Sequence, residues 1–277
     1  MALILATLSS LIFGVADFAG ALAARRVPAV TVVVGAHLTG LVGLSAVASL
    51  FAPGPPPAAD LGWGVLAGLG GSVGIALLYH ALATTPMSVT APVAAVVGTA
   101  VPVVFGVIIG ERPDPVAWVG MVLVIPALFL IPARGEAGNG SSMRALGLGS
   151  AVGVFFGLFG ILISRTGDAS GIWPLVAARA TSVALMIGVA LAWHRPVVPR
   201  RHAWPLACTA GLLDSAANVL FVLAVRMELL SLVAVIMAMY PASTVGLARI
   251  VLDERVHRTQ VVGMGIAVVA LILIAVA

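Results

Sequence analysis

Ten long apolar runs divide this chain, and no other feature of the sequence restricts its fold as strongly. An α-helix needs about twenty predominantly apolar residues to cross the roughly 30 Å hydrocarbon core of a bilayer. Short polar or proline-containing gaps separate runs of about this length. We therefore expect an all-α integral membrane protein with ten transmembrane helices, at 2–22, 29–52, 61–83, 87–110, 115–133, 145–166, 171–193, 203–225, 229–252 and 259–277.

The composition indicates a surface that faces lipid. Hydrophobic residues make up 61% of the 277 positions and charged residues only 9%, whereas soluble domains carry about 25% charged residues. The fourteen basic residues are all Arg, and most lie in the gaps between runs. Topology-setting charges are distributed in this way, so we expect no nucleic-acid partner. Arg without Lys is typical of GC-rich bacterial genomes, which predicts a multi-pass protein of the bacterial inner membrane.

The two halves of the sequence are related by a shift of 143 positions. At this offset Phe13-Gly14 aligns with Phe156-Gly157, and Glu111-Arg112 aligns with Glu254-Arg255. A Val-Gly-Met sequence follows the second match at the same distance in both halves. Chance similarity between apolar segments does not readily produce a shared charged dipeptide, so we interpret the chain as an internal duplication.

Two five-helix units joined by a linker follow from this duplication. The polar Gly/Ser-rich segment 135–144 is predicted to link a first repeat, 1–134, to a second, 145–277. Because five is odd, the second unit must start on the opposite membrane face, which predicts inverted repeats around a site near the midplane. Arg is concentrated in the gaps after the first, fifth, seventh and ninth helices. The positive-inside rule then places both termini outside.

The sequence also resembles the EamA repeat of the drug/metabolite transporter superfamily. The resemblance covers nearly the whole chain. It rests on Tyr79-His80-Ala81-Leu82, Pro86-Met87-Ser88 and Gly110-Glu111-Arg112 in the first half, and on Ala224, Ser231, Tyr240-Pro241 and Asp253-Glu254-Arg255 in the second. It implies a ten-helix carrier, commonly an exporter, of amino acids, related metabolites or drugs. Members typically have an Arg early in the second helix of each half; Arg179 fits this pattern, but the first half has Gly35-Ala36-His37 instead.

Charged residues inside the apolar runs are the main candidates for a site. Each costs about 2.5–3.5 kcal/mol on insertion scales, so such residues are rare unless they are paired or functional. Those that lie deep within a run are Asp17, Arg179 and Asp214, and Asn218 lies one helical turn beyond Asp214. We expect Arg179 to pair with one acid or with a substrate carboxylate, and the other acid to bind a coupled proton. The alternative is a structural Arg179–Asp214 pair, with Asp17 close enough to its helix end to reach water.

Four further polar residues are candidates for the same cavity. His37 could contact the solute or could be a hydrogen-bonded packing residue. Tyr240, Ser243 and Thr244 share one face of the predicted ninth helix beside Pro241. A proline inside a helix frees a backbone carbonyl, so this stretch could line the cavity or could only pack. The two Glu-Arg pairs of the repeat lie at helix ends, where we expect capping or gating.

These features favour a secondary transporter of a small organic solute, such as an amino acid, related metabolite or drug. The sequence has no metal-ligand spacing, phosphate-binding loop or nucleophile motif, so we expect no cofactor, no metal and no enzyme. Without a nucleotide-binding segment, uphill transport must use an ion gradient, for which protons are the candidate. One chain contains both halves and could work as a monomer in the lipid bilayer. A membrane-embedded enzyme and a channel are the alternatives.

Overall fold

The structure is a computed structural model, and it describes residues 1–51, 56–108, 114–131, 139–227 and 239–276. These residues are mainly helical and include no strand. A short 3-10 helix, η1 (Asp168–Ser170), precedes the seventh α-helix. The α-helices are α1 (Ala2–Ala24), α2 (Ala29–Phe51), α3 (Ala58–Thr84), α4 (Met87–Ile108), α5 (Pro115–Leu130), α6 (Asn139–Ile163), α7 (Trp173–Ala192), α8 (Trp204–Met227), α10 (Pro241–Val251) and α11 (Arg258–Val276).

Acidic side chains stabilise the starts of two helices. The Asp114 carboxylate accepts a hydrogen bond from the backbone N–H of Val116 at 2.9 Å, just before α5 begins with a proline. The Glu254 carboxylate accepts hydrogen bonds from the backbone N–H groups of Met87 and Ser88, both at 3.0 Å, at the start of α4. A carboxylate there satisfies helix N–H groups and complements the helix dipole. Capping is therefore the observed role of Glu254, whereas Glu111 lies outside the described residues.

Most helix ends lie within three residues of those predicted, but the sixth helix starts early. α6 begins at Asn139, whereas the sequence predicted a start at 145. Residues 139–144 of the predicted linker 135–144 are therefore helical. The physical reason is that polarity marks where a helix leaves lipid, not where its backbone hydrogen bonds end.

The predicted ninth helix, 229–252, is only partly described. Residues 228–238 lie outside the described residues, and 239–240 form a turn before α10. Pro241 is the first residue of α10. The prediction of a proline inside a continuous helix is therefore wrong at this point. Pro241 instead occupies the first helical turn, where a residue donates no intrahelical hydrogen bond, so the missing N–H of proline costs nothing there.

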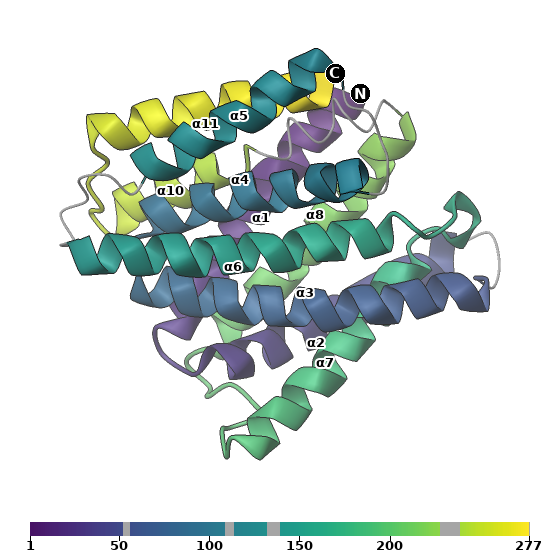
Figure 1. Ribbon diagram of the computed structural model, residues 1–277. Coiled ribbons are helices and arrows are strands. Elements are labelled where there is room, and N and C mark those ends of the chain that lie inside the picture. Colours follow the sequence, from purple (N-terminus) through teal and green to yellow (C-terminus); the bar gives the residue numbers. More distant parts are fainter. Residues whose placement is uncertain (52–55, 109–113, 132–138, 228–238, 277) are drawn as a thin grey trace.

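The helices form a single bundle in which they lie side by side (Figure 1). α5 packs against α11 at one edge, and α2 packs against α7 toward the other. Between these edges α1 packs against α8, and α3 packs against α6 and α7. α4 packs against α6 and α10. Helices from the first half of the chain therefore contact mainly helices from the second half.

The packing pairs follow the sequence shift of 143 positions. This shift relates α1 to α6, α2 to α7, α3 to α8 and α5 to α11. The α1–α8 contact is thereby the counterpart of α6–α3, and α2–α8 is the counterpart of α7–α3. The α2–α7 and α5–α11 contacts each join two helices that the shift relates to one another. Each of these helix contacts is thus present together with the contact to which the shift relates it. Duplication of one five-helix unit would produce this pattern.

Two glycines allow close helix crossings between the two halves of the chain. A Cβ atom on Gly68 of α3 would lie 2.5 Å from the carbonyl oxygen of Ala178 on α7. A Cβ atom on Gly211 of α8 would overlap the carbonyl group of Ala36 on α2. Gly68 and Gly211 are themselves 143 positions apart. Small residues allow helix backbones to approach closely where no expulsion of water drives association.

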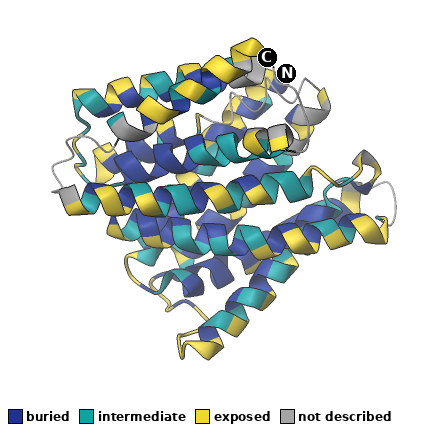
Figure 2. Ribbon diagram, viewed as in Figure 1, coloured by how far each residue is buried: buried dark blue, intermediate teal, exposed yellow. Residues whose placement is uncertain are grey.

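The surface of the bundle is apolar to an extent that water-exposed proteins do not tolerate. Many large hydrophobic side chains are exposed, among them Leu50, Ile108 and Ile250, each at least 75% exposed. Exposed residues follow the outer faces of the peripheral helices, while buried ones concentrate in the middle of the bundle (Figure 2). Within the described ranges, five helices are long and apolar enough to cross a membrane: Ala2–Ala24, Ala29–Leu50, Ala58–Thr84, Gly140–Ile163 and Trp173–Ala192.

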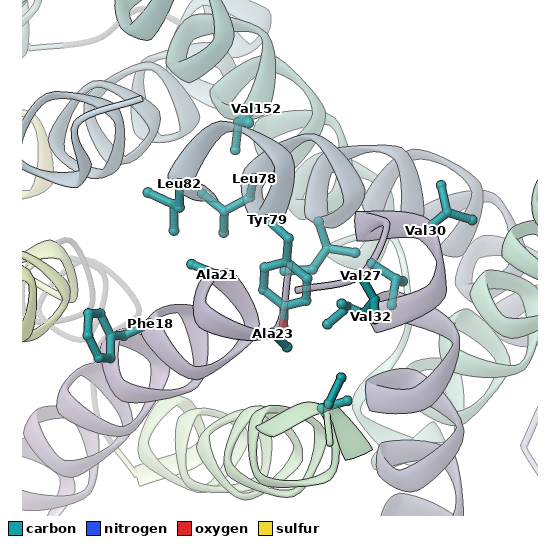
Figure 3. Close-up of a cluster of buried hydrophobic side chains, with 14 of the residues drawn as sticks. Phe18, Ala21, Ala23, Val27, Val30, Val32, Leu78, Tyr79, Leu82 and Val152 are labelled. Carbon is teal, nitrogen blue, oxygen red and sulfur yellow. The ribbon is translucent and has the colours of Figure 1, made fainter. Parts of the chain in front are cut away.

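The main hydrophobic core joins the first three helices to the second half. Tyr79 on α3 is only 1% exposed and belongs to this core. Figure 3 shows its ring directed from α3 toward α1, beside Ala21 and Ala23, with Val27 and Val32 on its other side. Gly20 of α1 makes this approach possible, because a Cβ atom there would overlap the Tyr79 ring. The core therefore presents a tyrosine to the C-terminal part of α1 at Gly20, one turn from Asp17.

Candidate functional site

An ion pair between Arg179 and Asp214 lies inside the bundle. Arg179 projects from the first half of α7, and its guanidinium donates to the carboxylate of Asp214 on α8. The two side chains are only 15% and 13% exposed. Asn218, one turn further along α8, donates to the Asp214 backbone carbonyl at 2.8 Å and to its carboxylate at 3.2 Å. Of the partners that the sequence left open for Arg179, the structure brings Asp214 to it.

His37 joins this pair to α2. Arg179 Nη1 lies 2.6 Å from His37 Nε2, and His37 Nδ1 lies 2.6 Å from Ser182 Oγ. A guanidinium can only donate, so Nε2 must be the acceptor and the imidazole must be neutral. Nδ1 then carries the proton and donates to Ser182. His37, at 3% exposed, occupies the place in the first half where the family resemblance led us to look for a second Arg.

Asp17 is buried on α1 without a basic partner among the described residues. It is 7% exposed, which is too little for the direct access to water considered from the sequence. Its carboxylate interacts electrostatically with that of Asp214, a like charge. No side chain in the described part of the chain donates a hydrogen bond to it. A carboxylate held in this way is costly in a membrane interior unless it takes up a proton or a cation.

Tyr240, Ser243 and Thr244 meet α1 close to Asp17. Thr244 Oγ1 donates to the Gly14 carbonyl at 3.1 Å. Ser243 Oγ lies 3.1 Å from the Leu11 carbonyl and 3.0 Å from the Tyr240 carbonyl, either of which can accept its one proton. Both hydroxyls thus lie against backbone carbonyls of α1. The Tyr240 hydroxyl is buried and has no hydrogen-bond partner in the described structure, and it interacts electrostatically with Asp17. Of these three residues, only Tyr240 keeps a polar group available for a ligand.

Sequence reasoning missed two members of this cluster. Ser182 lies three residues after Arg179, so the spacing alone places both on one face of α7. Tyr79 belongs to a segment that carries the family resemblance, yet an aromatic residue in an apolar run gives no sign of its neighbours. Tyr79 interacts electrostatically with Asp17, Asp214 and Arg179. The cluster is thus formed by Asp17, His37, Tyr79, Arg179, Ser182, Asp214, Asn218 and Tyr240.

The chemistry of this cluster is that of binding. In the ranges that the structure describes, no group of three or more His, Cys, Asp or Glu residues could hold a metal ion. Among the described residues, the cluster offers one ion pair, one carboxylate without a basic partner, the buried Tyr79 and the buried hydroxyl of the half-buried Tyr240. It draws on the first half through Asp17, His37 and Tyr79 and on the second half through Arg179 and Asp214, so it lies between the two units.

A bundle of apolar helices with a polar cluster between two related halves defines a multi-pass membrane protein with an internal site. The sequence pattern of the EamA-like transporter family matches residues 1–132 and again residues 143–276. The chain belongs to this family, whose members are transporters of small solutes in the drug/metabolite transporter superfamily, not enzymes.

Comparison with other known proteins adds evidence on the fold. No curated protein matches this sequence. The chain is similar to a solved structure described only as "Crystal structure of protein", with 16% sequence identity, a TM-score of 0.63 and 96% of each chain covered. At this identity the likeness concerns the fold alone.

Proposed function

We propose that this protein is a proton-coupled secondary transporter that exports a small organic solute across the bacterial inner membrane by alternating access. The observation that carries this proposal is the buried carboxylate of Asp17, which has no basic partner among the described residues and lies beside the Arg179–Asp214 pair, at the junction of two related units. A single chain contains both units, so we propose the monomer as the working form. The two units are 1–134 and 145–277.

Contacts between chain segments at the helix ends support ten crossings with inverted repeats. Such a topology puts the second and sixth connections on one face, and Asp60 at the start of α3 accepts from Gly167 N at 3.1 Å and from Ser170 Oγ. It puts the first and seventh connections on the other face, where Arg26 Nη1 lies 3.5 Å from the His202 carbonyl.

The third and ninth connections also belong on that second face in this topology. The contact of Glu254 with the start of α4 supports this placement. It joins the connection before α4 to the connection before α11.

Asp17 is the proposed proton carrier. The helices packed around Asp17 bring three titratable groups to it: Tyr79 from α3, Asp214 from α8 and Tyr240 before α10. Two further groups of the cluster, His37 on α2 and Arg179 on α7, lie behind them. Arg179 already compensates Asp214, and His37 is neutral in the observed hydrogen-bond arrangement. Asp17 is therefore the carboxylate in this cluster whose charge is left for a proton or a ligand to neutralise.

The test starts from the solute. Untargeted comparison of metabolites inside and outside cells, with and without the protein, identifies what it moves. The purified protein in proteoliposomes should then show saturable transport and counterflow of that solute. Saturation without counterflow or simple pore-like flux would favour a channel, and chemical conversion of the solute would favour a membrane-embedded enzyme.

Asp17→Asn tests the coupling directly. An imposed pH gradient should accelerate transport by the wild-type protein and should have no effect on the variant, because an amide cannot carry the proton. Asp253→Asn is the matched control: it also removes one carboxylate, and Asn tolerates the left-handed backbone of this exposed residue, where φ is 54°. An unchanged pH response in Asp17→Asn would contradict the coupling role.

A further inference from the structure

Counted over the described residues, the cluster between the two units has two carboxylates and one guanidinium, so one negative charge has no basic partner. Asp17 and Asp214 contribute two carboxylates and Arg179 contributes one guanidinium, which is held by Asp214 and His37. A substrate carboxylate would have to displace Asp214 from Arg179 while approaching Asp17. In a medium of low polarity such like-charge contact is strongly unfavourable. The charge balance thus favours a ligand with a positive charge.

The groups around Asp17 suit an organic cation. The Tyr240 hydroxyl is a buried polar group without a partner in the described chain, and Tyr79 presents its ring one turn further along α1. An ammonium group donates up to three hydrogen bonds, which a carboxylate and a phenol oxygen can accept. Aromatic faces also attract ammonium groups electrostatically. The metal-ligand sets that an inorganic cation needs are not found among the described residues.

We propose that the transported solute carries a protonated amine, and that Asp17, together with Tyr240 and Tyr79, recognises this group. This inference rests on the proposed transport function and names the substrate class for the same site. The Arg179–Asp214 pair then sets the charge of the site instead of binding a substrate carboxylate. A free carboxylate on the solute is not needed for recognition.

The first arm of the test is the identity of the solute. Among the solutes whose distribution changes when the protein is present, those that also show counterflow in proteoliposomes should contain a basic nitrogen. If the solutes moved have none, the amine inference is overturned while the transport function stands. If no solute moves at all, the transport function itself fails, and the amine inference fails with it.

The second arm measures binding with a matched series of probes. Phenethylamine, 2-phenylethanol and 3-phenylpropionate share a ring and a two-carbon chain but end in an ammonium, a hydroxyl and a carboxylate. We expect the amine alone to raise the unfolding temperature of the purified protein in a saturable way. Asp17→Asn should weaken amine binding by at least about tenfold, because a charge-assisted hydrogen bond is lost, and Asp253→Asn should leave it unchanged.

Two outcomes of the binding arm would contradict the inference. Stabilisation by the carboxylate probe, or by none of the three, would show that the site does not select an amine. Full amine affinity in a folded Asp17→Asn variant that has lost its response to a pH gradient would assign Asp17 to the proton only. Tyr240→Phe keeps the ring and removes the hydroxyl, so it should weaken amine binding less than Asp17→Asn does.

Discussion

At the scale of single residues, the cluster illustrates how charge is accommodated inside an apolar bundle. Arg179 is held on two sides, by the Asp214 carboxylate and by the His37 imidazole, and His37 is oriented in turn by Ser182. Each group satisfies the next, which is what low-polarity surroundings require. Among the described residues, Asp17 lacks a basic partner and the Tyr240 hydroxyl lacks a hydrogen-bond partner, and such exceptions to polar satisfaction are where ligand binding is expected.

Removing one charge of the Arg179–Asp214 ion pair should destabilise the protein more than replacing both residues with neutral ones. Asp214→Asn leaves Arg179 charged and without a carboxylate, and we expect it to lower the free energy of unfolding by roughly 3 kcal/mol. Adding Arg179→Gln removes the stranded charge while keeping a donor and an acceptor, so the double variant should recover most of the loss. Denaturant unfolding of the purified variants measures both effects. Additive losses in the double variant would show that the two side chains are not coupled.

The polar residues were visible in the sequence, but their partners were not. Asp17, Arg179 and Asp214 stand out because charge inside an apolar run is rare, whichever fold surrounds it. The choice of Asp214 over Asp17 for Arg179 depends on how α7 and α8 pack, which no local pattern encodes. Ser243 and Thr244 show the same limit: a shared helix face is predictable, but the structure was needed to show that this face meets α1 carbonyls.

At the scale of helices, close backbone contacts between the two halves define the bundle. α3 crosses α7 at Gly68, and α8 crosses α2 at Gly211. These crossings hold α2 and α7, which carry His37 and Arg179, against the opposite unit. A change in the crossing should therefore alter both stability and the geometry of the cluster.

Gly211→Ala tests the importance of this packing. The added methyl would overlap the Ala36 carbonyl of α2, and we expect a loss of about 1–3 kcal/mol in unfolding free energy from overpacking. Gly188→Ala on α7 is the control, because no atom lies within 4 Å of the Cβ that it adds. The control should be neutral or slightly stabilising, since Ala favours helix over Gly. Equal behaviour of the two variants would contradict the assigned role of Gly211.

Helix positions followed from the sequence more reliably than helix ends did. Apolar length predicted the described helices because spanning a bilayer requires it, whereas α6 extends into the polar segment Gly140-Ser141-Ser142. There the sequence looks like a linker, yet backbone hydrogen bonding continues. The start of α10 at Pro241 could have been anticipated, because proline is favoured in a first helical turn.

At the scale of the whole molecule, duplication accounts for the architecture. One five-helix unit used twice explains three observations: the sequence shift of 143 positions, the helix contacts that this shift relates, and the family pattern that matches two segments of the chain. In the proposed mechanism each of the two units adopts the other's conformation in turn, which gives two related states of the whole molecule. Alternating access from this arrangement requires that the units have opposite orientations.

Side-specific labelling of single cysteines tests that opposite orientation most directly. In a Cys208→Ser background, Ala59→Cys and His202→Cys place a thiol at exposed positions 143 residues apart, within the first turn of α3 and just before the equivalent helix α8. Ser164→Cys adds an exposed position near the sixth connection.

We predict that a membrane-impermeant reagent labels Ala59→Cys and Ser164→Cys from one side of the membrane, and His202→Cys from the other. Labelling of Ala59→Cys and His202→Cys from the same side would show that the two units are not inverted, and would contradict the proposed transport mechanism.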